Sequence, residues 1–155
     1  MPIRMFLLSL SLILSLPLLA PALAACPDLA GTYLCQTKSS TEEKISISQE
    51  VRNGVVLYTY NGAQFPADNK VHPIQDDDVK DGTMRSWCVQ DGETKLKSDV
   101  TGKISNVYGS WSDFRMSVTL WLEADVLRRT TVGYIKSPRI SYPIDHEEEC
   151  ARVSP

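Results

Sequence analysis

Apolar and polar positions alternate most regularly between residues 114 and 122. The apolar side chains fall on every second position, at Phe114, Met116, Val118, Leu120 and Leu122. Successive side chains of a β-strand point to opposite faces, so this segment predicts a strand with one buried face and one wet face. Weaker alternation at Ile45, Ile47 and Val51, and at Val132 and Tyr134, predicts further buried faces.

Dipeptides that favour tight turns separate the apolar runs. They are Asn53-Gly54, Asn61-Gly62, Asp81-Gly82, Asp91-Gly92, Thr101-Gly102 and Gly109-Ser110. Asn-Gly and Asp-Gly suit two-residue hairpins, because both central residues adopt positive φ. The sequence therefore predicts an all-β domain. The expected strands are 31–36, 44–52, 55–60, 63–67, 83–90, 93–100, 102–108, 114–125, 128–136 and about 148–153.

We expect this antiparallel meander of about eight to ten strands to close into a single lipocalin-like β-barrel, because closure removes exposed sheet edges. Two irregular regions interrupt the meander. Residues 67–80 contain Pro73 and the run Asp76-Asp77-Asp78, which predicts a long solvated loop. Pro138, Pro143 and the acidic run 145–149 predict a second irregular region before the last strand.

The first 24 residues have the pattern of a secretory signal peptide. Arg4 precedes a long apolar run that ends in Ala22-Leu23-Ala24, with small residues at the positions required for cleavage. The sequence therefore predicts a signal peptide at 1–24 and a single barrel domain at 25–155. The mature protein is expected to be exported, to the periplasm or the extracellular space.

An alternative for the same region is a lipid anchor. Leu23-Ala24-Ala25-Cys26 resembles the bacterial lipobox, which would place a lipid on Cys26 and the protein at the outer membrane. Membrane contact is expected only in that case. Two features favour soluble export: no polar tether follows Cys26, and the four cysteines form an even set for disulfides in an oxidising compartment.

The four cysteines, Cys26, Cys35, Cys88 and Cys150, can pair in three ways. In a closed meander the first and last strands pair antiparallel, which favours Cys35–Cys150 and leaves Cys26 to pair with Cys88. A local Cys26–Cys35 bridge is the main alternative.

Charge and motifs narrow the possible functions. The chain of 155 residues has a net charge of −3 and no clustered basic face, so nucleic acid is not an expected partner. It has no Gly-x-Ser-x-Gly motif, and its acidic runs do not match the spacing of a metal site. We therefore expect no catalytic residue, metal or cofactor. A hydrolase with two converging carboxylates is the alternative that spacing alone does not test.

Three aromatic residues are candidates for contact with a ligand or partner. Trp121 lies opposite the apolar face of the strand around 114–122, Trp111 shortly precedes the same strand, and Tyr33 lies at the head of the first strand. A large aromatic side chain on a wet face often marks a contact surface.

Two families resemble parts of this chain. Gly31-Thr32-Tyr33 resembles the Gly-x-Trp start of lipocalins, which implies a cavity for a small apolar ligand. Tyr33-Leu34-Cys35, with a cysteine near the C-terminus, resembles periplasmic β-barrel lysozyme inhibitors. The longer start, Cys26-Pro27-x-Leu29-x-Gly31-x-Tyr33-x-Cys35, is similar to uncharacterised exported bacterial proteins. We therefore expect a non-enzymatic barrel that binds a small apolar ligand or an envelope protein, with inhibition of a cell-wall hydrolase as the alternative.

Overall fold

The chain folds into ten antiparallel β-strands, as a computed structural model describes for residues 25–36, 42–105 and 109–154. These residues contain no helix, which confirms the all-β fold class. The expected signal peptide, residues 1–24, lies outside the described residues. The strands are β1 (Gly31–Gln36), β2 (Glu42–Arg52), β3 (Val55–Tyr60), β4 (Ala63–Pro66), β5 (Val71–Pro73), β6 (Val79–Asp91), β7 (Glu93–Ser105), β8 (Trp111–Glu123), β9 (Val126–Lys136) and β10 (Ser141–Ser154).

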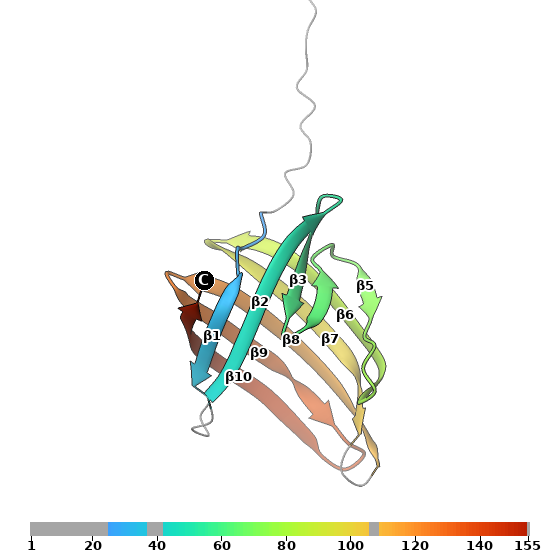
Figure 1. Ribbon diagram of the computed structural model, residues 1–155. Helices are drawn as coiled ribbons and strands as arrows, with labels where there is room; N and C mark the ends of the chain where they lie inside the picture. Colours follow the sequence, from blue (N-terminus) through green and yellow to red (C-terminus); the bar gives the residue numbers. More distant parts are fainter. Residues whose placement is uncertain (1–24, 37–41, 106–108, 155) are drawn as a thin grey trace, which may run out of the picture.

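All ten strands belong to one curled sheet that forms a half-barrel (Figure 1). The strand order is β4-β3-β2-β1-β10-β9-β8-β7-β6-β5. Strands that pair in the sheet are also consecutive in the chain, except for β1 and β10. These are the first and last strands, and they pair antiparallel. This pairing confirms the prediction that the two ends of the meander meet.

The sheet has two edges, β4 and β5, although these strands follow one another in the chain. Residues 67–70 join them at one end. There the Ala67 amide donates to the Val56 carbonyl at 2.9 Å, and the Asn69 amide donates to the Ser86 carbonyl at 2.8 Å. No ladder joins β4 to β5 in the part of the chain that the structure describes. One side of the barrel is therefore open.

Four segments differ from the expected strands. β6 begins at Val79, so the expected turn Asp81-Gly82 lies within this strand, where its register with β7 shifts. Val71–Pro73 forms β5 inside the expected loop, and β10 begins at Ser141 inside the second expected irregular region. Residues 141–149 of β10 pair with β9 alone, because β1 reaches only residues 150–154. An edge position tolerates Pro143, which has no amide to donate. Thr101-Gly102 is not a turn but lies within β7, whose ladder with β8 runs without interruption from Leu96 to Ser105.

Two glycines allow the coiled strands to approach closely. A Cβ atom at Gly133 in β9 would lie 2.0 Å from the Arg115 carbonyl oxygen of β8. A Cβ atom at Gly102 would lie 3.0 Å from the Cα of Gly82 in β6. Glycine inside a strand often marks such a close backbone approach, so Gly102 was misread as a turn signal.

The core fills one end of the half-barrel. Tyr33 and Tyr58 are fully buried there with Leu29, Ile45, Leu96 and Leu127. The segment before β1 enters this core: Tyr33 donates its hydroxyl to the Leu29 carbonyl at 2.9 Å, and Tyr58 donates to the Pro27 carbonyl at 2.6 Å. Residues 26–30 therefore plug one end of the barrel.

Two disulfides fix this arrangement. Cys35–Cys150 joins β1 to β10 at directly opposed positions, with 4.0 Å between the Cα atoms. Cys26–Cys88 ties the plug to β6, with 5.1 Å between the Cα atoms. The predicted connectivity is confirmed, and the local Cys26–Cys35 bridge is not formed. The Sγ atom of Cys26 is bonded to Cys88, so the lipidation alternative, which needs the same atom, is incompatible with this bond.

Candidate functional site

A hollow of about 340 Å³ lies on the concave face of the half-barrel, beyond the packed core. Its walls come from six strands and are mostly apolar. They consist of Tyr60, Ala63, Phe65, Met84, Ser98, Val100, Met116, Val118, Leu120, Arg129 and Thr131. A hollow of this size is large enough for a small ligand.

The position of each lining residue follows from strand alternation. In β8, Met116, Val118 and Leu120 point inward, as the sequence predicted, and Leu120 also belongs to the core. In β9 the prediction was wrong. Val132 and Tyr134 are 48% and 40% exposed, whereas Arg129 and Thr131, on the other face, line the hollow. Arg129 and Thr131 are polar residues on the inward face of β9. The positions of the apolar residues therefore predicted the wrong inward face for this part of the strand.

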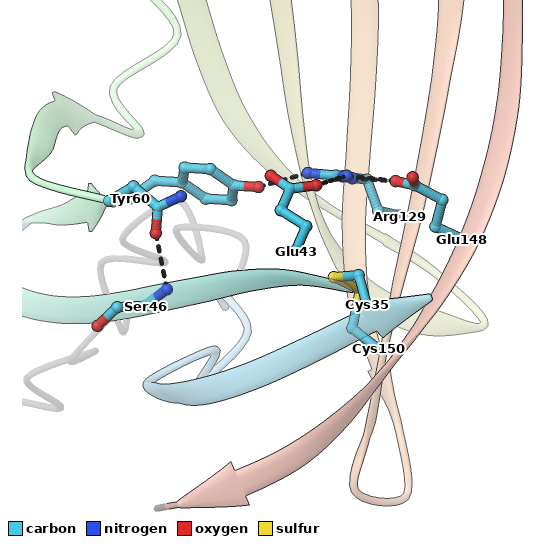
Figure 2. The surroundings of a disulfide bond; sticks show 8 residues. Cys35, Glu43, Ser46, Tyr60, Arg129, Glu148 and Cys150 are labelled. Atoms are coloured by element: carbon cyan, nitrogen blue, oxygen red, sulfur yellow. Dashed lines mark hydrogen bonds and ion pairs between the residues drawn. A yellow bond between two sulfur atoms is a disulfide. The ribbon is translucent and has the colours of Figure 1, made fainter. Parts of the chain in front are cut away.

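Arg129 bridges opposite walls of the half-barrel at the boundary between the core and the hollow. Its Nη1 donates to the Tyr60 hydroxyl of β3 at 2.5 Å, and its Nη2 donates to Glu43 of β2 at 2.7 Å. Its Nε donates to Glu148 of β10 at 2.5 Å, and Nη2 also pairs with Glu148. Figure 2 shows these four side chains in a row next to the Cys35–Cys150 disulfide. We call Tyr60, Glu43, Arg129 and Glu148 the polar floor of the hollow.

The charges of the polar floor do not cancel. Two carboxylates face one guanidinium, so the floor has a net charge of −1 when all three groups are ionised. Burial acts to lower the pKa of Arg129, but hydrogen bonds with Glu43 and Glu148 outweigh it and raise that pKa. Burial also raises the pKa of Tyr60, against the opposing effect of Arg129. Tyr60 is therefore a neutral hydroxyl at physiological pH.

Glu43 and Glu148 are converging carboxylates, the feature that a hydrolase would need. However, the Arg129 guanidinium lies between them and binds both. In a glycosidase the scissile bond must lie between the acid and its partner. Here the guanidinium occupies that position, so the geometry is that of a structural ion pair rather than of an acid and base facing a substrate.

A second hollow, of about 350 Å³, lies between the two sheet edges. It shares Ala63, Phe65 and Met84 with the first hollow and extends to His72 and residues 73–76. His72 Nε2 lies 2.9 Å from an Asp68 carboxylate oxygen, in the segment that joins β4 to β5. The apolar hollow is therefore continuous with the open side of the half-barrel.

Neither hollow is lined by the three aromatic residues that the sequence singled out. Trp121 lies half-buried on the outer face, with the Lys95 ammonium 4.9 Å from its ring centre. Trp111 is 41% exposed at the start of β8, with Lys80 6.0 Å from its ring. Tyr33 is fully buried and hydrogen-bonded within the core, so the expectation of a contact surface at Tyr33 is replaced by a role in packing.

Sequence reasoning did not identify the polar floor. Arg129 is 69 residues from Tyr60 and 86 residues from Glu43, so no local spacing connects them. One signal was present. Arg129 follows Leu127 by two residues in β9, so both lie on the same face of the strand, and Leu127 is fully buried. A charged residue on the inward face of a strand needs a buried partner.

No further class of site appears within residues 25–36, 42–105 and 109–154. These residues contain no group of three or more His, Cys, Asp or Glu side chains placed to hold a metal ion. They also contain no helix long and apolar enough to cross a membrane. The two disulfides indicate an oxidising, exported environment.

Comparison with known proteins adds no assignment. No protein-family model, no curated protein and no solved structure matches this chain. The functional argument therefore depends on the geometry of the hollow.

Proposed function

We propose that this protein is an exported, non-enzymatic binding protein that holds a small apolar ligand in the concave hollow of the half-barrel. The observation that carries the proposal is the hollow itself, which is lined by Phe65, Met84, Val100, Met116 and Val118 yet left unfilled by the core. A concave and mostly apolar surface with a hollow of about 340 Å³, which the fold leaves uncovered, favours a ligand role.

The residue types support binding of a flexible or irregular apolar molecule. Met84 of β6 and Met116 of β8 lie on either side of Val100 of β7 in one cross-strand row, and methionine side chains adapt to irregular shapes. The open side between β4 and β5 supplies a route of entry that needs no opening of the sheet.

A pair of matched variants on β8 tests this proposal. Val118→Phe fills the hollow, whereas Thr119→Phe adds the same side chain to the outer face one residue away. The probe is N-phenyl-1-naphthylamine, a neutral apolar fluorophore. We expect saturable binding to the natural chain, at least tenfold weaker binding to Val118→Phe, and unchanged binding to Thr119→Phe. Urea unfolding midpoints would confirm that both variants remain folded.

Two results would overturn the proposal. One is the absence of saturable binding to the natural chain, and the other is an equal loss of affinity in both variants. Export is tested separately by N-terminal sequencing of the mature protein, which we expect to begin at Ala25. A chain that retains residues 1–24 would contradict it.

A further inference from the structure

Given the proposed binding function, on which this inference rests, we infer that the polar floor selects ligands with a neutral hydrogen-bond acceptor, namely the carbonyl oxygen of an ester, ketone or amide, over ligands with a carboxylate. The recognition element is the Tyr60 hydroxyl beside the Arg129 guanidinium, and both residues line the hollow. The remaining walls are mostly apolar, and Ser98 and Thr131 are their polar members.

The hydroxyl hydrogen of Tyr60 is free to donate. Arginine has donors only, so the 2.5 Å hydrogen bond between Arg129 Nη1 and Tyr60 is accepted by the phenol oxygen. Among the described residues, no other group hydrogen-bonds to that oxygen, and its own hydrogen therefore has no acceptor there. The raised pKa of Tyr60, caused mainly by burial, keeps this hydrogen in place at physiological pH.

A second donor lies beside it. Of the five N–H groups of Arg129, Nε is used by Glu148, Nη2 contacts Glu43 and Glu148, and one Nη1 hydrogen is used by Tyr60. The other Nη1 hydrogen has no acceptor among the described residues. The two hydrogens of Nη1 point about 120° apart, so a ligand oxygen that accepts from the Tyr60 hydroxyl lies beside the guanidinium without also accepting this second Nη1 hydrogen.

The charges of the floor set the preference between acceptors. A ligand carboxylate would offer good acceptor atoms, but it would add a third negative charge near Glu43 and Glu148 against a single guanidinium. The side chain of Glu148 is only 18% exposed, so water screens this repulsion incompletely. A neutral carbonyl oxygen accepts the Tyr60 hydrogen bond without that repulsion.

A cationic group fits the floor less well, despite the negative net charge. An ammonium has donors only, and so it would leave both free donors of the floor unsatisfied. It would also have to share with Arg129 two carboxylates that each already bind the guanidinium through one oxygen. The geometry therefore favours a neutral acceptor over both ionic classes.

The test compares three molecules with one hydrocarbon chain: methyl laurate, lauric acid and dodecylamine. Each displaces the neutral fluorophore from the natural chain at neutral pH, below the concentration at which it forms micelles. We expect the ester to bind at least about tenfold more tightly than the acid and the amine. Equal or tighter binding of the acid would overturn the inference, and tightest binding of the amine would show a cation site instead.

Two variants assign the effect to named groups. Tyr60→Phe removes the free hydroxyl and should weaken binding of the ester about three- to tenfold more than it weakens binding of the fluorophore, which has no carbonyl oxygen. Its matched control is Tyr134→Phe, on the outer face of β9. Glu43→Gln should raise the affinity for lauric acid relative to that for the ester. An ester affinity that Tyr60→Phe lowers no more than the fluorophore affinity, or an acid affinity that Glu43→Gln does not raise relative to the ester affinity, would overturn the assignment.

The two proposals fail in different ways. If the fluorophore does not bind the natural chain at all, the proposed function itself is wrong. If the fluorophore binds but the acid competes as well as the ester, the hollow is a binding site and only the selectivity inferred for its floor is wrong.

Discussion

Removal of the Arg129 guanidinium is the perturbation that most directly tests the polar floor as a structural element. Arg129→Met retains much of the length and the apolar stem of the side chain but removes the charge and every hydrogen bond to Glu43, Glu148 and Tyr60. In the natural chain Glu43 and Glu148 share this one cation. In the variant the two carboxylates would lie close together without it.

The structure gives the expected magnitude. The side chains of Arg129 and Glu148 are 15% and 18% exposed, and that of Glu43 is 39% exposed. Removing one partner of a fully buried ion pair costs about 3–5 kcal/mol. Two unit charges about 5 Å apart repel by about 3 kcal/mol at an effective dielectric constant of about 20. Because Glu43 is partly solvated, we expect Arg129→Met to lower the free energy of unfolding by about 2–4 kcal/mol at neutral pH.

Urea unfolding at neutral pH, followed by tryptophan fluorescence, measures this loss.

A triple variant is the control. Arg129→Met with Glu43→Gln and Glu148→Gln removes the cation and both anions together, and it should recover most of the lost stability. A loss below about 1 kcal/mol for Arg129→Met, or no recovery in the triple variant, would refute the reasoning.

Three further predictions concern the fold. Replacing Cys35 and Cys150 with alanine opens a loop of 115 residues and should lower the free energy of unfolding by up to about 5 kcal/mol on the chain-entropy model, as measured by urea unfolding. A loss below about 1 kcal/mol would contradict a role in closing the meander. Gly133→Ala places a Cβ atom against the neighbouring backbone and should cost about 1–3 kcal/mol or more by thermal unfolding, whereas a neutral effect would show that the strands can separate. Burial raises the pKa of Tyr58, with Asp28 adding to the shift. The stability linked to this phenol is therefore fully present below about pH 10, the ordinary value for tyrosine, and falls as the pH rises further, because the unfolded chain ionises first. Unfolding measured between about pH 9 and 11 should show this fall, with a smaller slope in Tyr58→Phe, and an equal slope in that variant would contradict it.

The sequence by itself determined the fold class, the pairing of the first and last strands, and the connectivity of the cysteines. These features depend on local sequence patterns, and the patterns of successive segments support the same fold. Alternation at 114–122 defined β8, Asn-Gly pairs defined the turns at 53–54 and 61–62, and antiparallel closure placed Cys35 opposite Cys150.

Sequence reasoning failed where a local signal had two structural meanings. Gly102 follows Thr101 as in a turn, but it serves a close approach of strands within β7. The acidic run 145–149 was predicted to be irregular, yet it lies within β10, because β9 supplies a complete ladder of partners. In both segments the neighbouring strand decided the conformation, and the neighbour is not visible in the segment itself.

Only the tertiary structure decided the candidate site. Strand alternation states which face a side chain occupies, but it does not state which residues of distant strands meet across the concave face. That depends on the register and on the coiling of the sheet, which bring Tyr60 of β3 to Arg129 of β9 across the half-barrel. The hollow exists for the same reason: the core fills one end of the curled sheet, and the open edge between β4 and β5 leaves the adjacent apolar face uncovered.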